Sequence, residues 1–251
     1  MRSLFLVLRR EFVAYWTSPI AYVVIAMYMV LSGLFFFGEL SRFVSLVQRA
    51  GGEGVDVNQQ LIRSYLYSVS VMVLFLIPLV TMRLLAEERR QGTLEILLTT
   101  PARESVIVLG KYLAAVSLLL VMLGTSAAHV AILFVFGSPD PAPVFTGFLG
   151  LFLSGAVYVA MGLFLSGLTQ NQVVAGVLSF SLFLLLWLCH WVSTLTEGLL
   201  AEILRYLSLA GHFDNFGRGV IDTSDLVFFL SWIAAGLYAA TQAVLATRWK
   251  P

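Results

Sequence analysis

Long apolar stretches separated by short polar segments dominate the chain. Six of them approach the roughly 20 apolar residues that a helix needs to cross a bilayer: 20–37, 65–82, 112–136, 144–168, 173–195 and 226–247. The fourth and fifth lie in a region without Asp, Glu, Lys or Arg between Asp140 and Glu197, which is too long for one span, so we divide it at the polar Thr169–Gln172. The pattern predicts an all-α integral membrane protein with six transmembrane helices in one domain over residues 1–251.

Composition supports this class. Hydrophobic residues make up 59% of the chain and charged residues 12%, against about a quarter charged in soluble domains. The net charge of +1 gives no reason to expect a nucleic-acid partner. Arg2, Arg9, Arg10 and Glu11 disfavour a cleavable signal peptide, and Cys189, the only cysteine, excludes an intrachain disulfide or a cysteine-based metal cluster.

The basic residues predict the orientation. With both termini in the cytoplasm, ten basic residues face the cytoplasm and five face outward, which agrees with the positive-inside rule. The inner set is Arg2, Arg9, Arg10, Arg83, Arg89, Arg90, Arg103, Lys111, Arg248 and Lys250, and the outer set is Arg42, Arg49, Arg63, Arg205 and Arg218.

The first 18 residues have one apolar helical face. It comprises Leu4, Phe5, Leu8, Phe12, Tyr15 and Trp16. This face predicts a helix lying in the membrane interface and binding lipid, with Ser18–Pro19 turning the chain into the first span. The alternative is that the segment is simply the cytoplasmic end of a long first helix.

Two outer segments join the spans. The first, 39–64, contains Gly51–Gly54 and is expected to be a connection with helical ends. The second, 197–225, could form short helices dipping into the outer membrane face or a plain outer loop.

The segment 83–111 holds nine of the 29 charged residues, five basic and four acidic. Arg83 with Glu87, and Glu87 with Arg90, have helical spacing, so we expect the second span to continue as a helix beyond the membrane. Gly92 weakens that helix, and Thr100–Pro101 predicts the start of a second short helix that leads into the third span. The apolar stripe between them consists of Leu94, Leu97 and Leu98.

This mixture of charge and apolar surface is typical of a docking surface for another protein. The alternative, that the charges only anchor two helix ends, explains Arg83 and Lys111 but leaves the four carboxylates and the stripe unexplained.

The same segment resembles a known family. From Met82 it is written M-R-x-x-x-E-E-R-R-x-G-T-x-E-x-L-L-T-x-P, and it continues to Gly110-Lys111. It resembles the first cytoplasmic loop of the ABC-2 type permeases, the membrane subunits of one class of ABC exporters. R-R-E-F at Arg9–Phe12, S-P-I-A-Y-V at Ser18–Val23 and F-L-I-P-x-V-T-M-R at Phe75–Arg83 are most similar to the gliding-motility-associated branch.

The resemblance implies a permease in the cytoplasmic (inner) membrane of a bacterium, working with ABC ATPase subunits and with a second copy or a related permease. A periplasmic accessory protein is a further possible partner. The chain has no G-x-x-x-x-G-K-[ST] loop, so ATP and Mg would be bound by the ATPase, and the permease would have no cofactor, metal or catalytic residue of its own.

The family's functional residues carry over by position. The element connecting to the coupling helix matches Glu87, Glu88, Arg89, Arg90, Gly92, Thr93 and Glu95. The coupling helix itself, which sits in a groove of the ATPase, matches Pro101, Ala102, Arg103, Glu104 and Ser105. A second cytoplasmic contact is expected at Gln170, Asn171 and Gln172.

Two other functions are compatible with parts of the sequence. One is a scaffold that uses the same ATPase coupling to transmit force to periplasmic or cell-surface partners without transport. The other is an intramembrane enzyme, which would draw on His129, His190 or His212. None of these histidines has a second ligand at helical spacing, so we expect His129 and His190 to be hydrogen-bonded packing residues and His212 to form a surface cluster with Asp214 and Asp222.

Overall fold

The computed structural model describes residues 2–50, 56–93, 103–137 and 139–247, and their side chains except those of residues 2–8 and 247. All regular structure in these ranges is helical. The elements are α1 (Arg2–Thr17), α2 (Pro19–Arg49), the π-helical turn η1 (Asn58–Ile62), α3 (Arg63–Thr81), α4 (Ala86–Gln91), α6 (Glu104–Phe136), α7 (Pro141–Leu168), α8 (Gln172–Leu195), α9 (Leu199–Leu207), α10 (Leu209–Gly217) and α11 (Thr223–Thr247).

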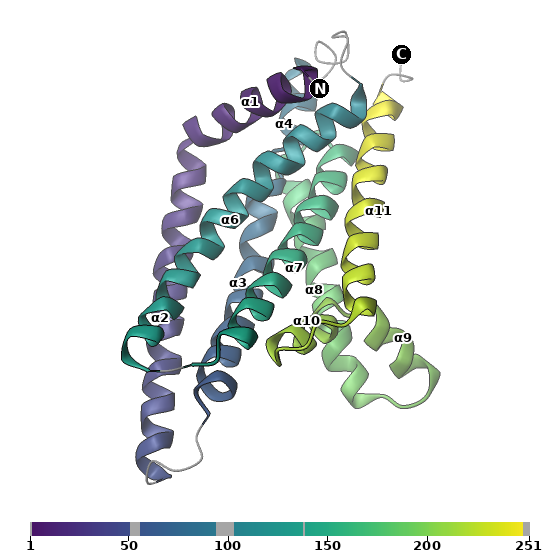
Figure 1. The fold of residues 1–251 in the computed structure, drawn as a ribbon. Coiled ribbons are helices and arrows are strands. Elements are labelled where there is room, and N and C mark those ends of the chain that lie inside the picture. The colour runs from purple at the N-terminus through teal and green to yellow at the C-terminus, as the bar shows by residue number, and fades with distance from the viewer. Residues whose placement is uncertain (1, 51–55, 94–102, 138, 248–251) are drawn as a thin grey trace.

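Six helices in the described ranges are long and apolar enough to cross a membrane, which confirms the predicted number. They lie side by side. The start of α1 and the end of α11 lie at the same end of the bundle as α4, whereas α9 and α10 lie at the opposite end (Figure 1). Two helices extend well beyond their predicted spans. Helix α2 continues to Arg49, and α6 begins at Glu104. The division at Thr169–Gln172 is also confirmed, since α7 ends at Leu168 and α8 begins at Gln172.

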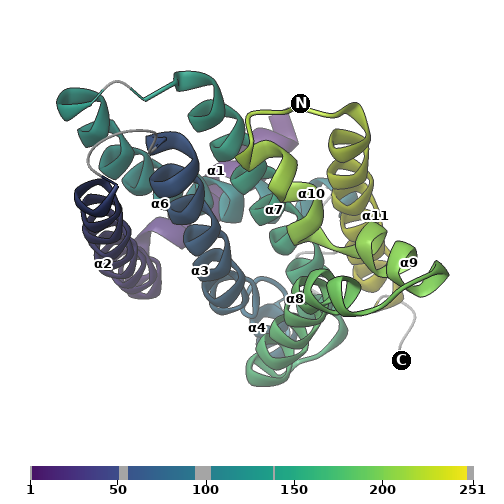
Figure 2. The ribbon, with the colours of Figure 1, turned by 90° about the horizontal axis from the view of Figure 1, so that it is seen from below.

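Helix α7 lies at the centre of the bundle. It packs against α3, α6, α8, α10 and α11, and Figure 2 shows it between α2 and α9 at the two edges. Its small residues allow this close packing: a Cβ atom added at Gly162 would lie 2.3 Å from Thr81 Oγ1 of α3, and one at Gly155 would lie 2.7 Å from a methyl carbon of Leu119 of α6. The small residues of α7 therefore allow the neighbouring helices to approach closely.

Helix α1 is separate from the first span. Ser18 has an extended backbone and Pro19 occupies the first turn of α2, where its missing N–H leaves no hydrogen bond unmade. Figure 1 shows α1 crossing the end of the bundle at a steep angle to α2, and α1 packs mainly on α6. The alternative of one continuous first helix is therefore wrong.

The segment 197–225 forms two short helices, so its reading as a plain loop is also wrong. Ser208 ends α9 and begins α10, where its hydroxyl accepts a hydrogen bond from the Gly211 N–H at 3.1 Å. Phe213 and Phe216 of α10 are buried, and Thr146 of α7 donates a hydrogen bond to the Phe216 carbonyl at 2.8 Å. Helix α10 is thus a packed part of the bundle. Gly51–Gly54 lie outside the described residues.

Candidate functional site

The chain leaves the second span by a tight turn instead of a continuing helix. Helix α3 ends at Thr81 and α4 begins at Ala86, so the predicted unbroken extension is wrong. Ser166 of α7 stabilises the turn: its Oγ accepts hydrogen bonds from the N–H groups of Leu85 at 3.1 Å and Ala86 at 3.0 Å, and donates to the Met82 carbonyl at 3.1 Å. This one hydroxyl supplies partners for backbone groups that the break in the helix would leave buried and unpaired.

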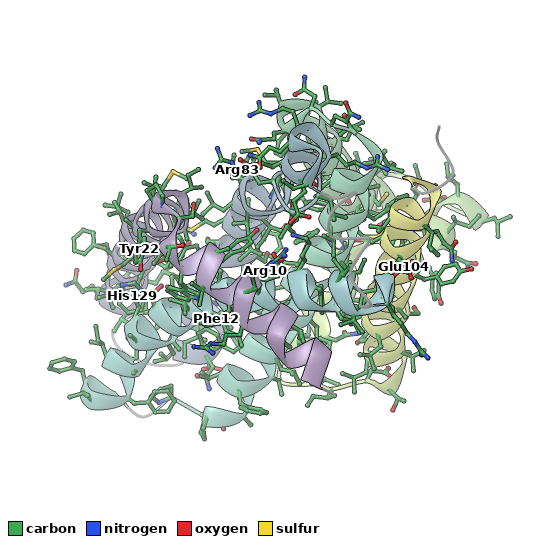
Figure 3. All side chains as sticks on the ribbon, turned by 90° about the horizontal axis from the view of Figure 1, so that it is seen from above. Arg10, Phe12, Tyr22, Arg83, Glu104 and His129 are labelled. Atoms are coloured by element: carbon green, nitrogen blue, oxygen red, sulfur yellow. The ribbon has the colours of Figure 1, made fainter. Side chains whose placement is uncertain are left out.

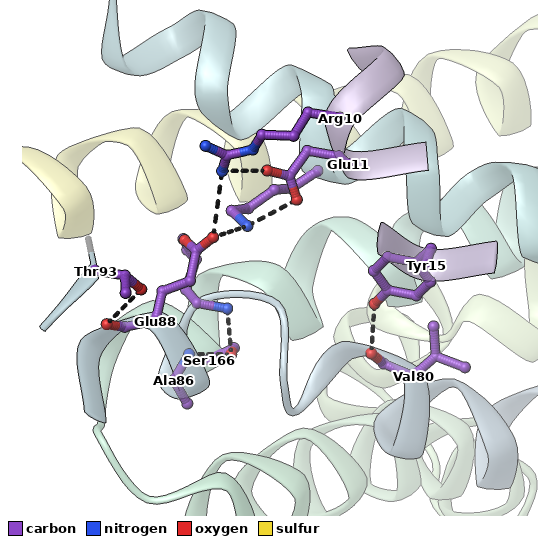
Figure 4. A network of polar contacts seen from close by, with 10 residues as sticks. Arg10, Glu11, Tyr15, Val80, Ala86, Glu88, Thr93 and Ser166 are labelled. Atoms are coloured by element: carbon purple, nitrogen blue, oxygen red, sulfur yellow. Dashed lines mark hydrogen bonds and ion pairs between the residues drawn. The ribbon is translucent and has the colours of Figure 1, made fainter. Parts of the chain in front are cut away.

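A cluster of four charged side chains joins α4 to α1 and α6 (Figure 4). Lys111 Nζ of α6 lies 3.0 Å from Glu11 Oε2 of α1 and 2.7 Å from Glu88 Oε1 of α4. Arg10 of α1 contacts Glu11 at 2.8 Å and Glu88 at 3.7 Å. We call Arg10, Glu11, Glu88 and Lys111 the four-charge cluster.

The centre of the four-charge cluster is buried. The side chain of Lys111 is 4% exposed and that of Glu11 6%, whereas that of Arg10 is 55% exposed. Burial alone would raise the pKa of Glu11, but the charge and hydrogen bond of Lys111, together with Arg10, outweigh burial and hold the pKa below its usual value. Glu11 and Lys111 therefore depend on each other, since removing either would leave a buried charge without its main partner.

Further contacts hold α4 to its surroundings. Arg89 donates a hydrogen bond to the Ala243 carbonyl of α11 at 3.2 Å. Beside α4, the Tyr15 hydroxyl of α1 donates to the Val80 carbonyl of α3 at 2.8 Å. Among the described residues Glu87 forms no ion pair with Arg83 or with Arg90, contrary to the prediction. The turn before Ala86 removes the helical spacing between Arg83 and Glu87, and within α4 Glu87 instead accepts a hydrogen bond from the Gln91 side-chain amide at 3.3 Å.

Gly92 follows the last residue of α4 and caps the helix. Gly92 has φ +68, a left-handed conformation that a residue with a Cβ adopts only with strain, and its N–H bonds to the Arg89 carbonyl. The prediction that Gly92 interrupts the helix is confirmed. Thr93 Oγ1 lies 3.4 Å from the Glu88 carbonyl. Glu95, Pro101, Ala102 and the stripe at 94–98 lie outside the described residues, as does Thr100.

The remaining predicted coupling residues lie at the start of α6. Arg103 precedes the helix with an extended backbone, and Glu104 and Ser105 form its first turn. No second break separates them from the third span, because α6 runs without interruption through Gly110 and Lys111 to Phe136. Glu104 and Ser105 are therefore the end of a membrane-spanning helix and not part of a separate short helix.

The turn between α7 and α8 lies beside α4. Asn171 begins α8, and its side chain accepts hydrogen bonds from the N–H groups of Val173 and Val174. Gln170, Asn171 and Gln172 line a shallow hollow together with Arg90 of α4. The structure thus brings the predicted second contact next to the first.

Helix α1 presents part of its predicted apolar face to the surroundings. Phe12 is 41% exposed, Trp16 is half-buried, and Tyr15 is turned toward α3. Figure 3 shows Phe12 and Arg10 along α1. The side chains of Phe5 and Leu8 lie outside the described part.

Sequence reasoning missed three residues of this site. In the sequence Glu11 is a charge that disfavours a signal peptide and part of the R-R-E-F motif, Lys111 ends the charged segment 83–111, and Ser166 is a small residue within an apolar span. Their partners are distant in the sequence: Lys111 and Glu11 are 100 positions apart, and Ala86 and Ser166 are 80 positions apart. The one available signal was a charged residue on an otherwise apolar helix, which marks a buried partner as often as an anchor.

The histidines take structural positions. His129 packs on Phe36 and lies 3.2 Å from the Tyr65 hydroxyl, which confirms the expected packing role. His190 Nδ1 is buried without a partner, so its expected hydrogen bond is not made at that atom. His212 bonds to the buried Asp225 at 2.5 Å and not to Asp214 or Asp222, which corrects the predicted surface cluster.

Comparison with known proteins gives one result. The family model described as "ABC-2 family transporter protein" matches residues 53–246, well over half of the chain. The matched region begins before α3 and covers the turn, α4, α6 and the remaining spans. A search of curated proteins found no match.

Proposed function

Since the chain belongs to the ABC-2 family of transporter membrane proteins, we propose that it is the permease subunit of an ABC exporter and couples ATP hydrolysis on separate ATPase subunits to movement of its own spans. In this proposal ATP and Mg are bound by the ATPase. The permease lies in the cytoplasmic membrane of a bacterium with both termini inside. The position of α1, α4 and the end of α11 at one end of the bundle supports that topology.

One observation carries the coupling role, namely the attachment of α4 to several helices at once. Glu88 contacts Lys111 of α6 and Arg10 of α1, Arg89 contacts the carbonyl of Ala243 in α11, and Ser166 of α7 binds the backbone where α4 begins. A short helix held only by solvent-exposed contacts would transmit little force. Because charged and backbone contacts, several of them buried, connect α4 to four helices, a displacement of the segment after Gly92 would be transmitted to most of the bundle.

The docking surface proposed for the ATPase is the segment that follows α4 together with its neighbours. It comprises Glu87, Glu88, Arg89, Arg90, Gly92, Thr93 and Glu95, the coupling residues Pro101 to Ser105, and the turn at Gln170–Gln172. The hollow shared by Arg90 and this turn supports one continuous contact surface.

The proposed working unit has two permeases and two ATPases. The exposed apolar side chains of α2, α8 and α11 leave room for a second copy or a related permease as well as for lipid. Closure of the ATPase pair would move α4, and the spans would change between inward and outward access.

The motifs at Arg9–Phe12 and Ser18–Val23 favour the gliding-motility-associated branch within the family.

Reconstitution tests the proposal. The chain is co-expressed with candidate ABC ATPases from its own genome, and ATP turnover is measured in proteoliposomes for wild type, Glu88→Ala and Glu95→Ala. The matched control is Glu202→Ala, an exposed acidic residue on α9 at the opposite end of the bundle. We expect Glu88→Ala and Glu95→Ala to lose most of the permease-dependent stimulation and the control to keep it. Unchanged stimulation in both variants would contradict the proposed docking surface.

A further inference from the structure

A hollow of about 250 Å³ lies under the elbow between α1 and α2. Its walls come from these two helices and from α3, α4 and α6. Apolar side chains form one part of the wall: Ile20, Ala21 and Val24 of α2, Leu79 of α3 and Leu118 of α6. Charged side chains form the other: Glu11, Arg83, Glu87, Glu88 and Lys111. The hollow is therefore amphipathic.

Several polar atoms of this wall have no partner within the described residues. Arg83 makes no hydrogen bond or ion pair there, and its Nε is buried. Glu88 uses one oxygen for Lys111, while its other oxygen, Oε2, is buried and unpaired. Glu87 accepts one hydrogen bond, at 3.3 Å from the Gln91 amide. Buried polar atoms without partners are costly, so a guanidinium and two carboxylates with spare capacity indicate a ligand that supplies both kinds of partner.

The chemistry of that ligand follows from the wall. A guanidinium pairs best with a phosphate or carboxylate, and carboxylates accept hydrogen bonds from an ammonium group. The apolar wall requires a hydrocarbon portion next to these charges. The volume lies below the roughly 300–1,000 Å³ of a pocket for a drug-sized molecule, so the hollow accommodates a small polar group and not a large solute.

The position of the hollow indicates that the small polar group belongs to a membrane lipid. Trp16 and Tyr22, whose rings pack edge to face, lie at the elbow, and Tyr22 is 55% exposed. Aromatic side chains of this kind gather at the headgroup level of membranes. Seen from above in Figure 3, Tyr22 and Arg83 lie on the same side of Arg10.

We propose that the elbow hollow binds the headgroup of a phospholipid that carries a primary ammonium beside its phosphate, as in phosphatidylethanolamine. Arg83 holds the phosphate, Glu87 and Glu88 accept hydrogen bonds from the ammonium, and the glycerol and first acyl carbons lie along Leu79, Ile20 and Val24. The site needs only that the chain lies in a membrane, so it stands or falls independently of the ATPase partner.

Native mass spectrometry of the detergent-purified protein tests the site. Phosphatidylethanolamine, phosphatidylcholine and phosphatidylglycerol with identical acyl chains are added in competition, and retained lipid is counted for each. We expect one phosphatidylethanolamine to be retained in preference to the other two. Phosphatidylcholine has no ammonium hydrogen to donate, and phosphatidylglycerol can donate only neutral hydroxyls, with no positive charge to pair with Glu87 and Glu88. Equal retention of all three by the wild type would overturn the proposal without any variant.

Two variants separate the contacts. Arg83→Gln should weaken retention of every phospholipid by about tenfold, the effect of losing one charge-assisted hydrogen bond. Glu87→Gln should instead reduce the preference for phosphatidylethanolamine over phosphatidylcholine by a similar factor. Arg42→Gln and Glu202→Gln, exposed residues at the other end of the bundle, serve as matched controls. If Arg83→Gln and Glu87→Gln both retained lipid with wild-type strength and selectivity, the proposed lipid site would also be overturned.

Discussion

Lys111 of α6 donates a 2.7 Å hydrogen bond to Glu88 of α4 from a position where its side chain is 4% exposed. The same ammonium group holds Glu11 of α1 at 3.0 Å. A single lysine at the end of a membrane-spanning helix thus fixes both the interfacial helix and the short helix that precedes the proposed docking segment. Movement of α4 cannot occur without either breaking this contact or moving α1 and α6 with it.

Lys111→Met should destabilise the protein strongly. It leaves Glu11 buried with Arg10 as its only charged partner, and removing one member of a buried ion pair costs about 3–5 kcal/mol. Denaturant titration in detergent micelles measures the free energy of unfolding. Arg10→Met is the control: because its side chain is 55% exposed, we expect a loss of about 1 kcal/mol or less. Equal losses in the two variants would contradict the central role of Lys111.

Stability should fall in acid through Glu11. Its pKa in the folded protein lies below the ordinary value of 4.5, so the carboxylate binds protons more weakly when folded than when unfolded. The resulting stabilisation is complete above about pH 4.5 and is lost as the pH falls through the lowered pKa. Melting temperatures between pH 6 and pH 3 should therefore drop more for wild type than for Glu11→Gln. Parallel curves would show that Glu11 does not contribute in this way.

Ser166→Ala should loosen the turn before α4. The change removes the partner of two buried N–H groups, those of Leu85 and Ala86, and buried unsatisfied groups cost about 1–3 kcal/mol. Hydrogen exchange of residues 82–91 reports the effect directly. The exposed Ser181 on α8 gives the matched Ser181→Ala control, in which exchange should not change. Normal protection of the turn in Ser166→Ala would mean that other contacts hold it.

Sequence patterns predicted the six spans, their division at Thr169–Gln172 and the separate α1, because hydropathy, proline and polar breaks are local signals. They failed where distant residues decide the outcome. The helical spacing of Arg83, Glu87 and Arg90 predicts that the second span continues as a helix through Arg83. The hydroxyl of Ser166, 80 residues beyond Ala86, instead supports a turn at that point. The pairing of Glu11 with Lys111 depends on how α1 crosses α6, which no local pattern reveals.

Two glycine substitutions should have opposite effects. Gly162→Ala would place its Cβ 2.3 Å from Thr81 Oγ1, so α3 and α7 would have to separate, at a cost of about 1–3 kcal/mol. Gly124→Ala on α6 meets nothing within 4 Å and should stabilise the helix by roughly 0.5–1 kcal/mol. Unfolding of both variants under the same conditions gives the comparison. A loss of stability in Gly124→Ala, or none in Gly162→Ala, would contradict the packing described for α7.

In the proposed mechanism the Lys111–Glu88 contact carries the coupling between α4 and the spans. The most direct measurement is a double-mutant cycle on ATPase stimulation in proteoliposomes, using Glu88→Gln, Lys111→Met and the double variant, each shown to bind the ATPase as wild type does. We expect each single change to remove most of the stimulation and the double variant to be no worse than either, because both act on one contact. Full stimulation in Glu88→Gln, or losses that simply add in the double variant, would contradict it.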